Sequence, residues 1–381
     1  MSEYDLSVVS CENYEDSTVS RALEDALSAI DGLSMVKPGM KVAIKANLVM
    51  TKKPEAAATT HPALVTALVR MLKERGASVV IGDSPGGPYN TGWLSAVYQA
   101  TGMRAAEDAG AKLNRDFSQR DAECSGGVVL KDFRYTAYLD DADLIIDMAK
   151  LKTHGMMGMT GAVKNMFGTI PGTLKPEYHC RFPKAELFAD MLIDLFEYFK
   201  PCLSIVDGVE GMEGNGPTAG TPRHIGVLIA SKSAYLCDLA CARIMGLETE
   251  KAPVLVQSIK RGLCPETLDG VRVHGEIEPF VLNDYGLIEP KDEYDTTSVF
   301  PKPLRMIMKR VFRTKPVLVP DKCVGCEVCK NTCPQKVIRM VNKKPKFNYK
   351  NCIRCFCCQE FCPKGALIVK RTGMARILNK L

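Results

Sequence analysis

The run CVGCEVCKNTCP occupies residues 323–334, and the run CIRCFCCQEFCP occupies residues 352–363. Both runs have the spacing C-x2-C-x2-C-x3-C-P. Three thiolates at this spacing can bind three irons of one [4Fe–4S] cube, and in two-cluster proteins the fourth cysteine of each run reaches the other cube. The repeated spacing therefore predicts two clusters, and it decides the fold of this part of the chain.

The crossed pattern assigns four thiolates to each predicted cluster. The first set is Cys323, Cys326, Cys329 and Cys362, and the second set is Cys352, Cys355, Cys358 and Cys333. Zinc sites rarely use a triple run of this kind, and disulfides among eight cysteines so close together would form strained, redundant loops. A ninth cysteine, Cys357, is interpreted as a small buried side chain, with a role as an alternative ligand left open.

Residues 316–371 resemble a bacterial two-cluster ferredoxin. The resemblance implies a small α+β module that transfers single electrons. We expect an α/β domain over residues 1–290, a basic linker over 291–315, and a basic tail over 372–381. Residues 304–313 of the linker could form a short amphipathic helix. This segment is either a solvated spacer or a helix that binds a membrane surface or a partner.

The length and composition place the chain among globular proteins. It has 381 residues, of which 46% are hydrophobic and 25% charged, and 16 are cysteines. It has no apolar run of about 18 residues that could span a membrane, and its first residues lack the basic flank and apolar stretch of a secretory signal. Many cysteines without such a signal favour a reducing compartment, so we expect a cytoplasmic protein without a transmembrane segment.

Charge is distributed unevenly along the chain. Residues 302–381 hold 20 Lys and Arg but only Asp321, Glu327 and Glu360 as acidic residues, a net charge of +17. The whole chain carries +6, so residues 1–301 carry about −11. A basic segment beside an acidic body indicates either that the two dock or that the basic segment meets an acidic partner, and an acidic electron carrier of the ferredoxin or flavodoxin type, or a redox enzyme, fits the second alternative. The basic residues are not interleaved with aromatic ones, which argues against nucleic acid.

The first 290 residues alternate between strand and helix patterns. The expected strands are 41–45, 78–81, 143–147, 203–206 and 225–229, and the expected helices are 63–75, 185–200 and 234–245. This alternation predicts an α/β layered fold with a mostly parallel sheet. No segment fits a nucleotide-binding motif. The glycine-rich stretch 208–220 is either a ligand-binding loop at the carboxyl end of a strand or a plain connection.

Residues 150–179 carry the densest chemistry of this domain. Lys150, Lys152 and Lys164, together with the earlier Lys45, could form a cationic pocket for a carboxylate or phosphate. Asp83, Asp207 and Asp238 flank apolar segments and could supply a base or a metal ligand.

Seven short motifs resemble the uncharacterised family known as domain of unknown function three-six-two. They are KANL at 45–48, THP at 60–62, GDSP at 82–85, KLKTH at 150–154, GAVKNMFG at 161–168, DG at 207–208 and EGNGP at 213–217. Ala46 is a departure, because the family usually has proline there. The family is often fused to a ferredoxin module, but it has no settled reaction. From these motifs we predict a cofactor-binding set that consists of Lys45, Asn47, His61, Asp83, Lys152 and Asn165.

Residues 154–164 are also similar to the H-x3-G-x-[ST]-G-[GA]-x-K segment of the nickel-dependent lactate racemase family. That resemblance implies that Lys164 is a cofactor tether or anion anchor, His154 an acid or base, and His179 a ligand. With Asp207 as a further base, these residues form the predicted catalytic set. The paired histidine motif of that family is not matched, since His61 stands alone.

Three functions follow from these patterns. The first is an iron–sulfur redox enzyme in which a two-cluster module exchanges electrons with a small anionic substrate or cofactor in the α/β domain. The second is a non-catalytic electron carrier or assembly subunit. The third is a racemase or isomerase with a tethered pincer cofactor and an additional metal.

Overall fold

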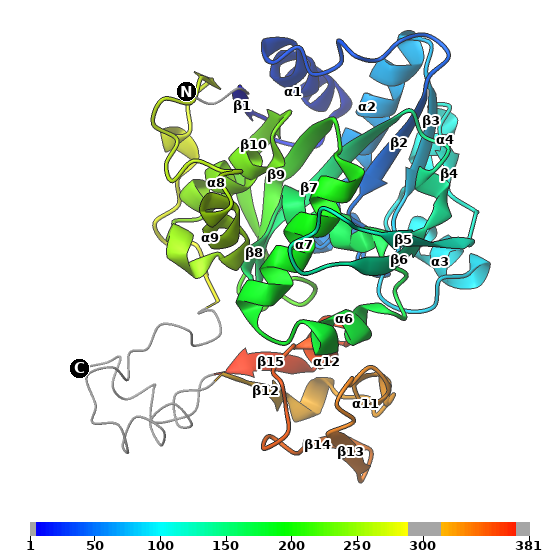
Figure 1. The fold of residues 1–381 in the computed structure, drawn as a ribbon, viewed down its shortest axis with the longest axis vertical. Coiled ribbons are helices and arrows are strands. Elements are labelled where there is room, and N and C mark those ends of the chain that lie inside the picture. The colour runs from blue at the N-terminus through cyan, green and yellow to red at the C-terminus, as the bar shows by residue number, and fades with distance from the viewer. Residues whose placement is uncertain (1–4, 289–313, 371–381) are drawn as a thin grey trace.

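The computed structural model describes residues 5–288 and 314–370 (Figure 1). Within these residues, a nine-stranded sheet has the order β11-β1-β10-β9-β7-β2-β3-β4, and β8 pairs with β7. Its strands are β1 (Leu6–Ser10), β2 (Lys41–Ala46), β3 (Ser78–Gly82), β4 (Lys112–Leu113), β7 (Leu144–His154), β8 (Gly158–Thr160), β9 (Leu203–Glu213), β10 (Thr221–Ser231) and β11 (Val273–His274).

The centre of the sheet is parallel. Strands β9, β7, β2, β3 and β4 run in the same direction, and β11 is parallel to β1. Strand β10 is antiparallel to both of its neighbours, β9 and β1. The prediction of an α/β fold with a mostly parallel sheet is confirmed.

One stretch differs from the expectation. Residues 208–213, expected within a glycine-rich loop, continue strand β9, where they pair with β10 from Gly208 to Glu213 and bury Val209 and Met212. The loop is therefore confined to residues 214–220, between β9 and β10.

Helices cover both faces of the sheet. One face carries α1 (Asp16–Ala29), α2 (Pro62–Glu74), α3 (Thr91–Ala100) and α4 (Ala105–Asp108). The other carries α5 (Ala162–Asn165), α6 (Lys175–Arg181), α7 (Ala185–Phe199), α8 (Ala234–Ile244) and α9 (Pro253–Lys260). The three predicted helices are confirmed to within one residue at each end. No helix in the described parts of the chain is long and apolar enough to cross a lipid bilayer.

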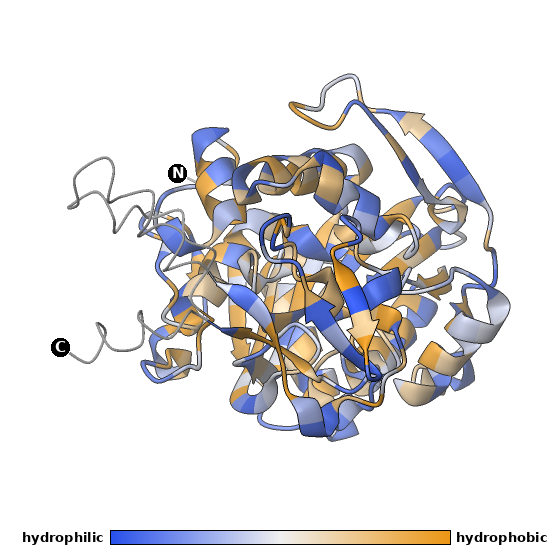
Figure 2. Ribbon diagram, turned by 90° about the horizontal axis from the view of Figure 1, so that it is seen from below, coloured by the Kyte–Doolittle hydropathy of each residue, from blue (hydrophilic) through white to orange (hydrophobic). Residues whose placement is uncertain are grey.

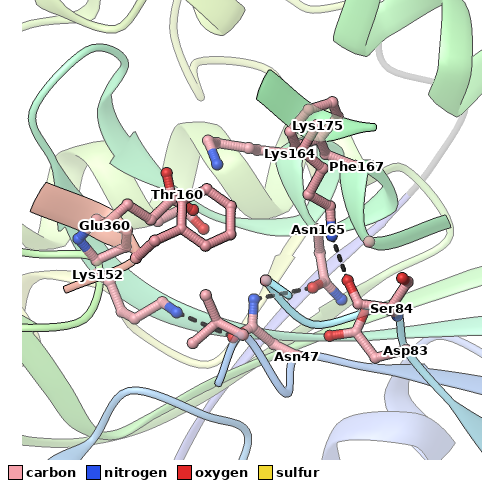
Figure 3. Close-up of a pocket in the computed structure, with 15 residues that line it drawn as sticks. Asn47, Asp83, Ser84, Lys152, Thr160, Lys164, Asn165, Phe167, Lys175 and Glu360 are labelled. Atoms are coloured by element: carbon pink, nitrogen blue, oxygen red, sulfur yellow. Dashed lines mark hydrogen bonds between the residues drawn. The ribbon is translucent and has the colours of Figure 1, made fainter. Parts of the chain in front are cut away.

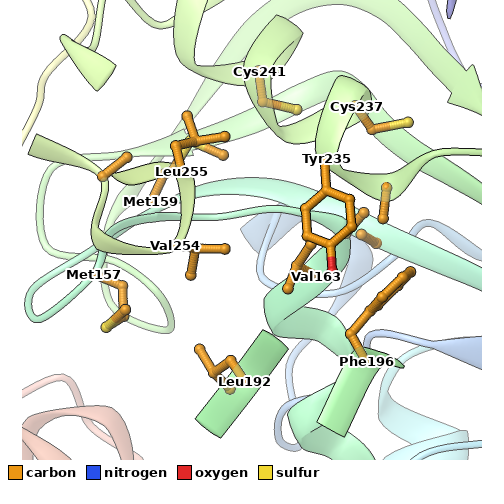
Figure 4. Packing of buried hydrophobic residues seen from close by; sticks show 14 of the residues in the cluster. Met157, Met159, Val163, Leu192, Phe196, Tyr235, Cys237, Cys241, Val254 and Leu255 are labelled. Atoms are coloured by element: carbon orange, nitrogen blue, oxygen red, sulfur yellow. The ribbon is translucent and has the colours of Figure 1, made fainter. Parts of the chain in front are cut away.

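Two hydrophobic cores lie on opposite faces of the sheet. In β10, Val227 and Ile229 join the core beneath α7 and α8, whereas Leu228 and Ala230 join the core beneath α1 and α2. Successive strand side chains point to opposite faces, so a strand buried on both faces is apolar throughout. Figure 4 shows Leu192, Tyr235 and Val254 from three helices of the first core.

Short elements complete the larger part. The two strands β5 (Gln119–Glu123) and β6 (Asp132–Thr136) form a separate hairpin. The single 3-10 turns are η1 (Pro54–Ala56), η2 (Ala137–Leu139), η3 (Met166–Thr169), η4 (Thr249–Lys251) and η5 (Glu278–Phe280).

The cysteine-rich segment forms a small α+β module, as predicted. It contains the turn η6 (Pro320–Lys322), the hairpin β13 (Ile338–Val341) with β14 (Lys344–Phe347), the pair β12 (Lys315–Leu318) with β15 (Leu367–Lys370), and the helices α11 (Val328–Asn331) and α12 (Cys357–Glu360). We call residues 314–370 the cluster module. The predicted helix at 304–313, nearly all of the predicted linker, and the tail lie outside the described residues.

The cluster module lies against the carboxyl end of the parallel strands (Figures 1 and 2). The loop 214–220 holds it there. Asn215 exchanges side-chain hydrogen bonds with the backbone of β15, at 3.1 Å to Leu367 and 3.2 Å from Val369. Gln359 donates to the carbonyls of Asn215 and Gly216, both at 3.1 Å. The expected ligand loop is therefore also the contact that positions the module.

Candidate functional site

The eight predicted cluster cysteines line two separate cavities. Cys323, Cys326, Cys329 and Cys362 line one cavity, and Cys333, Cys352, Cys355 and Cys358 line the other. These are the two sets that the crossed pattern assigns. No three His, Cys, Asp or Glu side chains of the described residues are close enough to share a single metal ion.

The two runs also repeat a backbone geometry. Glu327, after the second cysteine of the first run, has φ +60°, and Phe356, at the same place in the second run, has φ +59°. Each turn leads directly into a short helix, α11 or α12, that carries the third cysteine of its run. Cys357, in α12, is fully buried as predicted.

A third cavity, of about 50 Å³, lies where the cluster module meets the sheet (Figure 3). We call it the interface cavity. The larger part contributes Asn47, Val49, Asp83, Ser84, Gly86, Lys152, Thr160, Lys164, Asn165, Phe167, Gly168, Lys175 and Pro217, and the cluster module contributes Glu360 and Phe361.

The parallel strands place most of these side chains. Asn47 follows β2, Asp83 and Ser84 follow β3, and Lys152 is near the end of β7. The carboxyl ends of parallel strands meet at one edge of a sheet, which is where ligands bind in open α/β folds. Lys164 and Lys175 reach the same edge from α5 and α6.

A buried polar network forms the floor of the interface cavity. The Lys45 ammonium lies 2.9 Å from Asp83 Oδ1 and donates to the Ala46 carbonyl at 2.8 Å. Asn47 donates to Asn165 Oδ1 at 3.0 Å, and Asp83 Oδ2 accepts from the Leu48 amide at 2.7 Å. Lys45 and Asp83 neutralise each other, so this pair fixes the floor without adding net charge.

Three further lysines give the interface cavity its positive charge. Burial, with repulsion from Lys164, lowers the pKa of Lys152 to about 7. Burial also lowers the pKa of Lys175 to about 8, and that of Lys164 below its ordinary value. Three desolvated ammonium groups face one carboxylate, that of Glu360. Their pKa values fall mainly because burial removes the charged forms from water, and a bound anion would offset that cost.

The three lysines differ in how many hydrogen bonds they already make. Lys152 donates to Asn47 Oδ1 at 2.9 Å and to the Ala58 carbonyl at 2.6 Å. Lys175 donates to the carbonyl of Ser84. Lys164 makes no hydrogen bond or ion pair within the described chain; its ammonium lies 5.9 Å from the centre of the Phe167 ring.

Asp238 holds the helix that presents Lys164. From α8, Asp238 accepts hydrogen bonds from the backbone amides of Ala162, at 2.6 Å, and Val163, at 3.3 Å. These amides open α5 and would otherwise be unsatisfied. Asp238, predicted as a base or metal ligand, thus positions Lys164 and does not line the cavity.

His154 lies just behind the interface cavity. Its Nδ1 accepts from the backbone amides of Met156, at 3.2 Å, and Met157, at 3.1 Å. Nδ1 must therefore keep its lone pair, and the proton of the neutral ring resides on Nε2, 3.9 Å from Glu360 Oε2. Burial holds the pKa of His154 well below its ordinary value. This geometry favours a hydrogen-bond donor over the acid or base predicted from the sequence.

Three other predicted site residues lie away from the interface cavity. His179 is buried in α6 and stacks on Phe188, with ring centres 4.3 Å apart. Asp207 accepts from Lys150 at 2.9 Å and from Tyr14 at 2.8 Å. His61 stacks on Tyr14 with ring centres 3.5 Å apart.

The Asp207 group is a closed network. The backbone amide of His61 donates to Asp207 Oδ2 at 2.9 Å, and Tyr14 accepts from Lys150 at 2.8 Å. Burial lowers the pKa of His61 to about 4. Every polar atom of Asp207 has a partner, so this network ties the chain before α1 and α2 to the sheet.

Sequence reasoning missed several residues of the interface cavity. Ser84 is inside a motif that we recognised, and Lys175 is inside the segment that we judged densest in chemistry, but neither was singled out. Glu360 carried a signal, since it is one of only three acidic residues in the strongly basic stretch 302–381. Phe361 gave none.

Comparison with known proteins is consistent with this two-part organisation. Residues 42–243 match the model of a domain of unknown function (DUF362), and residues 315–363 match a 4Fe-4S dicluster domain. The chain is 31% identical over 268 residues to the thylakoid-associated protein sll1697 of Synechocystis, in an alignment that covers 68% of this chain and 80% of that protein.

Two solved structures share parts of the fold. The lactate racemase apoprotein from Thermoanaerobacterium thermosaccharolyticum has a TM-score of 0.43 and 13% identity, over 64% of this chain and 57% of that one. A structural-genomics protein from Thermotoga maritima has a TM-score of 0.37 and 13% identity, over 61% and 60%. The chain thus spans less than two thirds of either. The family and cluster-domain matches, with the 31% identical relative, show that the chain is a member of the DUF362 family that carries a 4Fe-4S dicluster domain.

Proposed function

We propose that this protein is an iron–sulfur oxidoreductase whose two [4Fe–4S] clusters exchange electrons with a small anion in the interface cavity. One observation carries the proposal. Glu360 and Phe361, which close the cavity, lie in sequence between Cys358 of the second thiolate set and Cys362 of the first. The wall of a cationic cavity is thus part of the cluster-binding loop.

The number of clusters rests on the two separate cysteine cavities. Each is lined by four cysteines, the complement that one [4Fe–4S] cluster requires. When bound, such clusters supply one-electron transfer. The role of the surrounding protein is to hold the substrate anion beside them and to keep water away from it.

The lysines perform the binding. Lys152, Lys164 and Lys175 attract and orient the anion, and the buried site strengthens these interactions relative to water. His154 Nε2 lies 3.9 Å from Glu360 Oε2 and makes no hydrogen bond within the described residues. Phe361 and Phe167 supply apolar walls that limit access of solvent.

The exposed side of the cluster module fits an acidic electron carrier of the ferredoxin or flavodoxin type, or an acidic redox enzyme. Cys326 is exposed, and Lys322, Lys336, Lys343 and Lys346 are exposed on the same small module. An acidic partner would be steered toward this surface and would exchange electrons through the first thiolate set. Such a carrier, like the predicted cytoplasmic location, is part of the proposal.

The test uses the full chain with its clusters loaded and chemically reduced without oxygen. Reduced protein is mixed with a panel of small electron-accepting oxyanions, such as nitrite and sulfite, and cluster oxidation is followed by absorbance. Oxidation whose rate saturates with the concentration of one anion supports the proposal. If no anion of the panel oxidises the clusters but an acidic ferredoxin exchanges electrons with them normally, the protein is a non-catalytic carrier. Iron accompanied by near-stoichiometric nickel would favour a pincer-type isomerase.

A further inference from the structure

We infer that the ligand of the interface cavity is a small oxyanion of about four non-hydrogen atoms, anchored by Lys164. Carboxylates and inorganic oxyanions of the size of acetate, bicarbonate or nitrate belong to this class. The inference rests on the site that the proposed function uses, but it concerns binding alone and does not depend on electron transfer.

The size of the ligand follows from the volume of the cavity. The free volume is about 50 Å³. A cavity needs about 10–15 Å³ of such volume to hold one water molecule. The interface cavity therefore has room for about four atoms of that size when the cluster module is docked. A nucleotide or a flavin has many more atoms than this volume holds.

The charge of the ligand follows from the lysines. Lys45 is neutralised by Asp83 at 2.9 Å, which leaves Lys152, Lys164 and Lys175 against Glu360. An anion with a single negative charge, or two, would balance the protonated lysines. A neutral or cationic ligand would leave several desolvated charges without compensation, which costs free energy.

The hydrogen-bonding character of the ligand follows from the donors that remain. Each ammonium has three N–H donors. Lys152 uses two on Asn47 and Ala58, Lys175 uses one on Ser84, and Lys164 uses none within the described chain. Most of the remaining donors thus belong to Lys164 and Lys175, whose ammonium groups lie 5.9 Å and 5.6 Å from the centre of the Phe167 ring. Oxygen atoms with several lone pairs match such a wall of donors, and a halide would match it less well.

Binding calorimetry on the oxidised, cluster-loaded full chain tests the inference. The probes are acetate, bicarbonate and nitrate, with chloride, benzoate and citrate as comparisons. We expect at least one of the three small oxyanions to bind saturably and more tightly than chloride, benzoate or citrate. Equal binding of benzoate or citrate, or no binding of any small oxyanion, would overturn the inference.

Variants identify the anchor. Lys164→Met should weaken binding of the small oxyanion about 10- to 100-fold, since it removes a charge-assisted set of hydrogen bonds. Lys37→Met, which removes the same charge from an exposed position outside the cavity and outside the cluster module, should leave it unchanged. Iron content and the unfolding temperature show that each variant is folded. Lys164→Met removes a buried charge that has no ion-pair partner, so its free energy of unfolding should not fall below that of the unchanged protein. Equal effects of the two substitutions would show that the anion does not bind at Lys164.

The outcome separates this inference from the proposed function. Tight binding of a small oxyanion without any oxidation of reduced clusters would support the anion site and contradict its role as an electron acceptor. Oxidation of the clusters by bulky acceptors, with no small anion bound, would contradict the anion site alone.

Discussion

The ring of Phe361 lies directly against Gly86, so closely that a Cβ atom added to Gly86 would fall 2.1 Å from Phe361 Cε1. Gly86 follows strand β3, and Phe361 lies between two cluster cysteines. This contact joins the two parts of the protein at the wall of the interface cavity. The absence of a side chain at residue 86 lets the cluster module approach the sheet.

We therefore expect Gly86→Ala to displace Phe361 and loosen the docked module. The variant should show faster hydrogen exchange in the loop 214–220 and weaker binding of the small oxyanion, with unchanged iron content. Gly126→Ala is the matched control, because a Cβ atom there would meet no atom within 4 Å. Protection of the loop equal to that of the unchanged protein would show that this contact does not determine docking.

Binding of the anion should depend on pH in a defined direction. The pKa values of Lys152 and Lys175 are lowered to about 7 and about 8, and the charged groups that act on them are Lys45, Asp83, Lys150, Lys164 and Glu360. An anion stabilises the protonated lysines and raises their pKa values, so binding takes up protons. Affinity should therefore fall as pH rises from about 7 to 9. Calorimetry in buffers of different ionisation enthalpy measures the uptake; proton release on binding would contradict the assignment.

The network around Asp207 should contribute stability and not catalysis. Asp207→Ala leaves the buried Lys150 ammonium without its carboxylate, so the free energy of unfolding should fall by about 3–5 kcal/mol. The double variant with Lys150→Met removes both charges and should recover much of that loss, as a double-mutant cycle in denaturant would show. Oxyanion binding should persist in the double variant. A folded double variant that no longer binds the anion would make Asp207 part of the site after all.

Two neighbouring cysteines of α12 should behave differently. Cys358 lines the second cysteine cavity, whereas the fully buried Cys357 lines neither. We expect about eight irons per chain in the unchanged protein and in Cys357→Ala, and about four in Cys358→Ala. Iron analysis of protein purified without oxygen measures this. Loss of iron from Cys357→Ala would show that the ninth cysteine is a ligand.

Much of the fold and part of the site could be predicted from the sequence because they depend on local patterns. The cysteine spacing indicated the two thiolate sets. The apolar periodicity of α2, α7 and α8, with the glycine or proline that follows each helix, gave their limits to within a residue. Lys45, Asn47, Lys152, Lys164 and Asn165 were predicted and do meet, since β2 and β7 end at one edge of the sheet and α5 begins at the same edge.

The remainder depends on contacts between distant residues. Asp207 follows a strand as Asp83 does, but Lys150 and Tyr14 enclose it in a separate network. Glu360 reaches the interface cavity because the cluster module docks there. The charge asymmetry left docking open as one alternative, but no local pattern indicates which residues meet. The glycine content of residues 208–213 predicted a loop, but these residues belong to β9, in which Val209 and Met212 are buried.

The most direct test of the central claim is a single-turnover measurement of electron transfer from the reduced clusters to the bound anion. Stopped-flow absorbance would follow cluster oxidation by the accepting oxyanion in the unchanged protein, in Lys164→Met and in Lys37→Met. The account predicts that Lys164→Met slows oxidation about 10- to 100-fold at subsaturating anion, while Lys37→Met leaves the rate unchanged. Equal oxidation rates in all three proteins would contradict the claim that electrons leave the clusters through the interface cavity.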